Sequence, residues 1–210
     1  MRAATKQLWA QQDRHEGDRH RLFEAIADTV DAETVLYPGS FVDVAASFVF
    51  DSVTYVDSDT RAKKFFGDTA GVAELVAEHS EDDDREPEVT FIKADYTKKL
   101  DLENESFDLL VSLYGGFVSE HCTQYLRVGG FLLVNGSHGD ASMASIDERY
   151  QLVGVVTSRA GEYRVTRHDL NSYFVPKKRN EEITPELLHE LGKSVSYTKT
   201  PFAYLFERVE

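Results

Sequence analysis

The chain has 210 residues, a length that suits one domain with a full hydrophobic core. Its 37 acidic and 23 basic side chains give a formal net charge of −14, which disfavours tight binding to nucleic acid or to an anionic membrane. The single cysteine, Cys122, excludes an internal disulfide, and no apolar run reaches the roughly 18–20 residues of a membrane span. We therefore expect a cytoplasmic protein without a nucleic-acid or membrane partner, whereas the sequence does not indicate its oligomeric state.

The first third of the chain begins with a helical segment. Apolar residues at helical spacing predict a helix over 19–30, with Asp18 as its N-cap, and the residues before it fit a further helical arm. We expect residues 1–33 to form a helical cap over one compact domain that spans residues 34–210. The acidic run 81–84 and the basic run 177–179 fit solvated loops.

Five short apolar runs alternate with helical patterns in the middle of the chain. The runs predict strands over 34–37, 53–56, 89–93, 109–113 and 131–135, and the patterns between them predict helices over 41–50, 61–66, 72–79 and 117–126. Repeated strand and crossover units demand a mostly parallel sheet with helices on both faces. The sequence therefore predicts the α/β class with a doubly wound sheet.

The last third of the chain has a different pattern. Residues 151–157 and 163–167 flank a glycine-containing loop and predict a hairpin, and 173–176 is another short extended run. A helix is expected over 184–191, with Thr184 as cap and Pro185 at its first position. A closing strand follows over 202–209.

The stretch from Val35 to Asp59 is typical of a nucleotide pocket. It contains an apolar strand, a turn with Gly39, a second apolar strand and then Asp57, which stands where a carboxylate can accept from ribose hydroxyls. The turn has one glycine where a dinucleotide loop has three, which favours a ligand without a pyrophosphate.

The order and spacing of five motifs resemble the class I S-adenosylmethionine-dependent methyltransferase family over residues 35–135. The motifs are VLYPGS, VTYVDSD, FIKADYTKKL, SFDLLVSL and YLRVGGFLLVN. The resemblance implies a seven-stranded sheet with an antiparallel C-terminal strand and S-adenosylmethionine as cofactor. It does not identify the methyl acceptor.

The resemblance also implies a set of cofactor-binding residues. The first motif, with Tyr37, Pro38, Gly39 and Ser40, would meet the methionine part of the cofactor; Asp57 and Ser58 would lie at the ribose; Asp95 and the Tyr96 amide would face the adenine; Ser112, Leu113 and Tyr114 would line the floor near the sulfonium. For Asp57 and Asp95 the alternative is an ordinary helix cap after a strand.

The first motif departs from the family pattern at three positions. Tyr37 stands where most members have an acidic residue, and Phe41 and Asp43 stand where they have further glycines. Asp43 either replaces the missing carboxylate partner of the methionine amine or caps the following helix.

Methyl transfer needs alignment of the acceptor and sometimes a general base. The candidate catalytic residues are His138, shortly after the fifth strand, Tyr114, just after the fourth, and His121 on the helix that follows it. Acidic ligands for a metal are missing after these strands, so we expect no required metal.

The best-supported function from sequence is O- or N-methyl transfer from S-adenosylmethionine to a small-molecule acceptor. One alternative is a non-catalytic protein that binds a nucleoside or S-adenosylhomocysteine on the same fold. A less favoured alternative is an NAD-dependent oxidoreductase. The fold alone does not choose among them.

Overall fold

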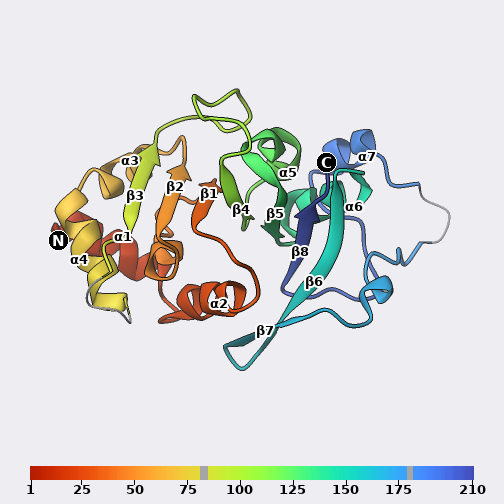
Figure 1. The fold of residues 1–210 in the computed structure, drawn as a ribbon, viewed down its shortest axis with the longest axis horizontal. Helices are drawn as coiled ribbons and strands as arrows, with labels where there is room; N and C mark the ends of the chain where they lie inside the picture. The colour runs from red at the N-terminus through yellow and green to blue at the C-terminus, as the bar shows by residue number, and fades with distance from the viewer. Residues whose placement is uncertain (81–84, 179–181) are drawn as a thin grey trace.

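A computed structural model describes residues 1–80, 85–178 and 182–210, so the acidic run 81–84 and Arg179 of the basic run lie outside the described residues. The described residues form a single eight-stranded sheet (Figure 1). In spatial order the strands are β3 (Glu88–Ile92), β2 (Ser52–Val56), β1 (Thr34–Pro38), β4 (Phe107–Ser112), β5 (Leu126–Val134), β8 (Ala203–Arg208), β6 (Tyr150–Arg159) and β7 (Glu162–Thr166). The strands from β3 to β5 in this order are parallel, and β8 is antiparallel to both β5 and β6.

This arrangement confirms the predicted α/β class, with eight strands where seven were expected. The hairpin of β6 and β7 supplies the additional strand, because β7 pairs with β6 and forms one edge of the sheet. The strand order reverses between β1 and β4, since β2 and β3 extend to one side and β5 to the other. In doubly wound sheets, ligands bind at the carboxyl ends of the strands at this reversal.

Helices cover both faces of the sheet, and each face has its own apolar core. One face packs against α1 (Ala3–Gln12), α2 (Asp18–Ala27), α3 (Thr60–Phe66), α4 (Thr69–His79) and the 3₁₀ turn η1 (Ala45–Phe48). The other packs against α5 (Val118–His121) and α6 (Asp140–Ile146), and α7 (Pro185–Leu191) lies against α6. Three further 3₁₀ turns are η2 (Thr123–Tyr125), η3 (Ser137–Gly139) and η4 (Leu170–Ser172).

The helix expected over 41–50 is wrong, because only η1 forms there. Phe41 has a left-handed φ of 51°, and the Tyr55 hydroxyl contacts the Val44 carbonyl and the Ser47 amide that a longer helix would use. A side chain from β2 therefore replaces helical hydrogen bonds in this segment.

Three smaller expectations also need correction. The helix expected over 117–126 is limited to α5 and η2, because Leu126 already pairs with Phe107 at the start of β5. Gly17, with φ 71°, is the N-cap of α2 in place of Asp18. The run 173–176 forms no strand, and only Pro176 makes an isolated bridge, to Tyr197.

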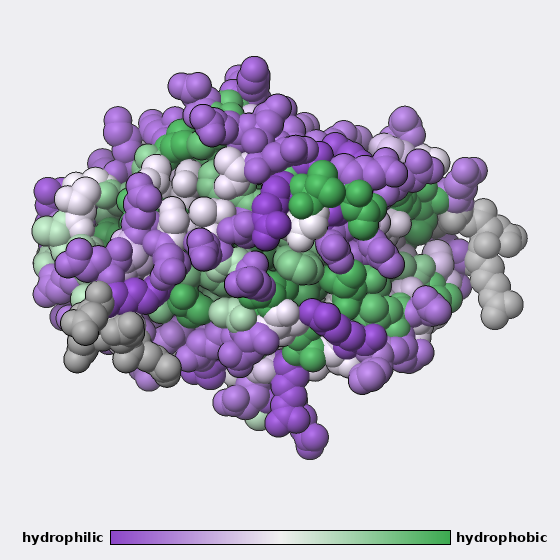
Figure 2. Space-filling view, in the orientation of Figure 1, coloured by the Kyte–Doolittle hydropathy of each residue, from purple (hydrophilic) through white to green (hydrophobic). Residues whose placement is uncertain are grey.

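The surface reflects the charge balance of the sequence. The face shown in Figure 2 is mostly hydrophilic, and hydrophobic residues are visible in the region of β6 and β8.

In the described ranges the longest helix, α4, has 11 residues, and no helix combines the length and apolar character needed to cross a membrane.

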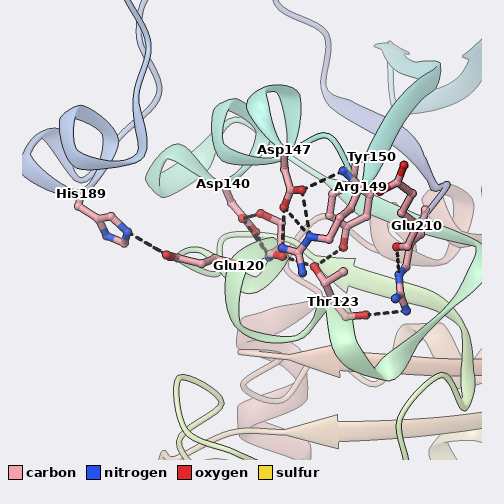
Figure 3. Close-up of polar contacts among 10 residues, drawn as sticks. Glu120, Thr123, Asp140, Asp147, Arg149, Tyr150, His189 and Glu210 are labelled. Carbon is pink, nitrogen blue, oxygen red and sulfur yellow. Dashed lines mark hydrogen bonds and ion pairs between the residues drawn. The ribbon is translucent and has the colours of Figure 1, made fainter.

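Asp140 is a fully buried carboxylate that joins three elements of the second face (Figure 3). It accepts hydrogen bonds from the Ser112 hydroxyl at the end of β4 and from both the amide and the hydroxyl of Ser119 on α5. Burial raises the pKa of Asp140, and these donors offset part of that rise. The carboxylate thus fixes the end of β4 against α5 and α6.

Asp140→Ala should lower the free energy of unfolding by about 2–4 kcal/mol, because it leaves several buried donors unpaired. Urea denaturation would measure the change. Asp169→Ala serves as a control, since the Asp169 side chain is exposed and its ion pair with Lys199 should contribute no more than about 1 kcal/mol. Equal costs for the two variants would contradict the role given to Asp140.

Candidate active site at the reversal of strand order

The turn after β1 is held in an unusual conformation by contacts from β2. Gly39 has φ 68° and donates its amide to the Val56 carbonyl at 2.8 Å. The Phe41 amide donates to Asp57 Oδ2 at 2.8 Å, and the Asp59 backbone amide donates to Asp57 Oδ1 at 2.7 Å. Asp57 therefore shapes the β1 turn and its own loop but is not the helix cap that the sequence left open, because the N-cap of α3 is Asp59, whose side chain accepts from the Arg61 amide.

Asp57 keeps acceptor capacity beyond these two bonds. Each carboxylate oxygen can accept more than one hydrogen bond, and the side chain is half-buried at the carboxyl end of β2. Ser58, the next residue, is exposed. This geometry is compatible with a pair of ligand hydroxyl groups at Asp57.

Asp95 lies just beyond β3 and is exposed. Its Oδ1 accepts from the amide and hydroxyl of Thr97, and these bonds hold the pKa of the Asp95 carboxyl below its usual value. Asp95 remains charged at neutral pH and open to a donor from outside.

A buried ion pair lies beside the β1 turn. Arg19 of α2 places Nε 3.2 Å from Asp43 Oδ2, and the Tyr37 hydroxyl donates to the same oxygen at 3.0 Å. The Arg19 guanidinium also lies 5.2 Å from the centre of the Tyr114 ring. Burial raises the pKa of Asp43, and the Arg19 charge offsets part of that rise.

Arg19 is the main residue of this region that the sequence analysis missed. It shares the face of α2 that carries Leu22, Phe23 and Ile26, all of which are fully buried. A single basic residue on an apolar helical stripe is the pattern that could have indicated it, because such a charge needs a buried partner.

A cavity of about 520 Å³ lies over this ion pair, between the β1 turn and the connection from α1 to α2. Of the predicted site residues, those that line it are Tyr37, Gly39, Ser40, Asp43, Leu113 and Tyr114. Two polar atoms of residues that line it, Ser40 Oγ and Arg19 Nη1, are buried without a hydrogen-bond partner in the described part of the chain. Unpaired buried polar atoms are uncommon and fit a site that is completed by a ligand.

The other predicted cofactor-binding residues are not part of the lining. Pro38, Asp57, Ser58, Asp95, Tyr96 and Ser112 are outside it. The Ser112 hydroxyl is bound to Asp140, and the Tyr96 ring packs beside Gly39.

The two predicted catalytic histidines are not brought to the cavity. His138 is exposed and has φ 53°, and its Cβ lies near Gly116. His121 on α5 has its Nε2 atom 3.9 Å from Glu120 Oε2.

Cys122 is fully buried, and burial raises the pKa of its thiol to about 12, so this thiol stays protonated at neutral pH. Within the described ranges, no three acidic, histidine or cysteine side chains converge as a metal site would require.

A second cavity, of about 730 Å³, lies between α4 and β3. It is lined mainly by apolar side chains, among them Phe66, Val76 and Phe91, and is away from the carboxyl ends of the strands. This second cavity is larger than the one over the ion pair. The cavity over the ion pair, however, is the one that coincides with the reversal of strand order.

Comparison with known proteins gives matches among solved structures only. No family model matches the chain, and no curated protein matches it. The O-methyltransferase TomG from Streptomyces achromogenes, described in complex with SAM, is 14% identical; the alignment covers 79% of this chain and 87% of that one, with a TM-score of 0.47. An O-methyltransferase from Bacillus cereus, described in complex with SAH, is 12% identical over 79% of this chain and 89% of that one, with a TM-score of 0.43.

Arg19→Met should destabilise the fold by about 3–5 kcal/mol at pH 7, because it leaves the Asp43 carboxylate buried without its cation. Without the guanidinium, the pKa of folded Asp43 rises further above its unfolded value. The folded state then binds a proton that the unfolded state does not, so the destabilisation should shrink as the pH falls from 7 to 5.

Urea denaturation at several pH values would measure this dependence. Arg159→Met is a control, since Arg159 is exposed at the end of β6 and its loss should have a small effect that does not change with pH. A large cost that is constant between pH 5 and pH 7 would contradict the pairing of Arg19 with Asp43.

Proposed function

We propose that the protein is an S-adenosylmethionine-dependent methyltransferase that modifies an oxygen or nitrogen atom of a small molecule. The observation that carries this proposal is the pair of complementary subsites at the reversal of strand order. The Asp57 carboxylate bonds the β1 turn at the Phe41 amide, and the unpaired donors of Ser40 and Arg19 belong to residues that line the cavity beside the same turn.

The nucleoside end of the cofactor fits the first subsite. Its ribose hydroxyls are donors that match the free lone pairs of Asp57, and its exocyclic amine matches the exposed carboxylate of Asp95. Both residues follow neighbouring parallel strands, so the two groups of one nucleoside can reach them together.

The amino-acid end fits the second subsite. Its carboxylate can accept from Ser40 Oγ and Arg19 Nη1, which are buried and have no hydrogen-bond partner among the described residues. Among the described residues, Asp43 Oδ1 receives only a long hydrogen bond, of 3.4 Å, from the Ala45 amide, which leaves capacity for the ammonium group. In this proposal Asp43 both supports the turn and replaces the acidic residue that Tyr37 displaces.

When bound, the cofactor supplies a methyl group on a positively charged sulfur. The protein has to align the acceptor, exclude water and allow the acceptor to lose a proton. We place the acceptor in the cavity near Tyr114, because this is the predicted catalytic residue that lines it. A role for His138 or His121 in proton removal stays a prediction.

A small-molecule acceptor is supported by the size of the cavity and by the net charge of the chain. A volume of about 520 Å³ is within the range of small-ligand pockets. The net charge of −14 weakens any electrostatic attraction of nucleic acid.

Asp57→Ala should weaken the binding of S-adenosylhomocysteine by about 1–3 kcal/mol, because two ligand hydroxyls lose their acceptor. Isothermal titration calorimetry would measure the affinity. Asp101→Ala is a matched control, since Asp101 is an exposed carboxylate on the loop after β3. Unchanged affinity in Asp57→Ala would remove this residue from the site.

Ser40→Ala should lower the affinity for S-adenosylhomocysteine several-fold and leave the affinity for adenosine unchanged. Its hydroxyl has no partner among the described residues, so its removal should not reduce the free energy of unfolding. The same titrations with the two ligands separate the carboxylate subsite from the nucleoside subsite. An equal loss for both ligands would contradict this assignment.

Calorimetry of the unmodified chain with S-adenosylmethionine, S-adenosylhomocysteine and NAD tests the proposal as a whole. Micromolar binding of the first two, followed by methyl transfer in an acceptor screen, is the expected result. Binding without transfer to any acceptor would favour the non-catalytic alternative, and binding of NAD alone would favour an oxidoreductase.

A further inference from the structure

The end of α1 and the connection to α2 form one part of the lining of the cavity over the ion pair. This part, the α1–α2 wall, consists of Gln11, Gln12, Asp13, Arg14 and His15. The rest of the lining comes from the start of α2, from β1 and its turn, and from the loop after β4 (the β4 loop). The proposed amino-acid subsite lies entirely in that second group. The α1–α2 wall is therefore the part of the lining that remains for the methyl acceptor.

Backbone and side-chain contacts hold the connection in place at the cavity. Asp13 Oδ1 accepts from the Gly17 amide at 2.9 Å. Arg21 of α2 donates to the Glu16 carbonyl at 3.0 Å and to the Gly161 carbonyl, in the loop between β6 and β7, at 2.8 Å. The connection is thereby fixed to α2 and to the β6–β7 hairpin, so the side chains of the α1–α2 wall have a defined place beside the cavity.

Four side chains of this wall have no structural role of that kind. Among the residues that the structure describes, the side chains of Gln11, Gln12, Arg14 and His15 make no hydrogen bond or ion pair. Polar side chains that line a cavity without a partner in the protein are available to a ligand. The α1–α2 wall therefore suits a polar acceptor molecule.

His15 is the only histidine among the described residues that line this cavity. Its side chain is exposed, whereas His20 on α2 packs edge-on against the Phe48 ring, with 5.3 Å between the ring centroids. The predicted catalytic residues His138 and His121 are outside the lining. Histidine titrates near neutral pH, and its neutral ring can accept a proton. His15 thus has both the position and the chemistry of a base for the acceptor.

We propose that His15 is the catalytic base that accepts the proton of the methyl acceptor. This inference rests on the proposed function, because it concerns the same cavity. A lone pair on the acceptor oxygen or nitrogen forms the new bond to the methyl carbon, and the carbon–sulfur bond breaks with its electron pair on sulfur. The proton of the acceptor passes to the neutral ring of His15 and from there to water, since this side chain is exposed.

The two forms of the cofactor provide a test that needs no known acceptor. S-adenosylmethionine and S-adenosylhomocysteine differ by one methyl group and by the positive charge on sulfur. A unit charge about 6–8 Å from a partly exposed imidazole should lower the pKa of that histidine by roughly 0.5–1 pH unit. An NMR titration should therefore give a lower pKa for His15 in the complex with S-adenosylmethionine than in the complex with S-adenosylhomocysteine.

The difference between the two complexes isolates the charge on sulfur. Other charged and titratable groups surround His15 in both complexes, and their effect on its pKa cancels in the difference. These groups are Asp13, Arg14 and Glu16 of the same connection, Asp18 and Arg19 of α2, Tyr37 of β1, Asp43 of the β1 turn and Tyr114 of the β4 loop.

His15→Gln identifies the NMR signal of His15 by its loss. Because the side chain is exposed and has no partner among the described residues, this variant should keep the free energy of unfolding. Its affinity for S-adenosylhomocysteine should stay within about two-fold of that of the unmodified chain. His168, which is exposed beyond the end of β7, is the internal control, and its pKa should be equal in the two complexes.

The acceptor screen gives a second readout. With an acceptor that the unmodified chain methylates, His15→Gln should lower kcat by about 10²-fold or more and remove the loss of rate at low pH. His168→Gln should keep both the rate and its pH dependence. An unchanged kcat in His15→Gln would show that His15 is not the base.

The outcomes separate the base from the function on which it rests. If both forms of the cofactor bind and the pKa of His15 is equal in the two complexes, His15 is not near the sulfur and the inference is wrong, while the proposed function stands. A difference at His138 or His121 in its place would also overturn the inference and would favour the residues predicted from sequence. If neither form binds, the proposed function fails and the role of His15 fails with it.

Discussion

The buried ion pair between Arg19 and Asp43 is the interaction on which the rest of the site depends. It joins α2, the β1 turn and, through the Tyr114 ring, the β4 loop. A carboxylate as deeply buried as Asp43 is unfavourable without a cation, so α2 must pack where Arg19 reaches it. The position of the helical segment over the sheet is therefore coupled to the chemistry of the cavity.

The β1 turn illustrates how one carboxylate can serve both the fold and a ligand. Asp57 holds the Phe41 amide and thereby keeps an aromatic residue in a left-handed conformation that only a specific contact would maintain. The Arg61 guanidinium lies over the Phe41 ring, 4.7 Å from its centre. A turn fixed in this way can replace a glycine-rich one, because its shape comes from side-chain contacts rather than from free backbone rotation.

Several parts of the fold follow from local pattern. The alternation of apolar runs and helical spacing predicted the five parallel strands, the hairpin of β6 and β7 and the cap of α7 by Thr184, whose Oγ1 accepts from the Leu187 amide. Local pattern gave the wrong prediction for segment 41–50, because the Tyr55 hydroxyl on β2 bonds the Ser47 amide and the Val44 carbonyl of this segment. Propensity describes what a segment favours alone, and tertiary contacts can override it.

The sequence by itself determined the class of the fold, the order of strand and helix along most of the chain and the placement of Asp57 and Asp95 after neighbouring strands. These features depend on residues that are close in the chain, so the sequence pattern records them. Tertiary structure alone decided that Arg19 meets Asp43, that Tyr96 meets Gly116 and that Ser112 meets Asp140. Each of these contacts joins residues at least 20 positions apart, and only the packing of the sheet and its helices brings such residues together.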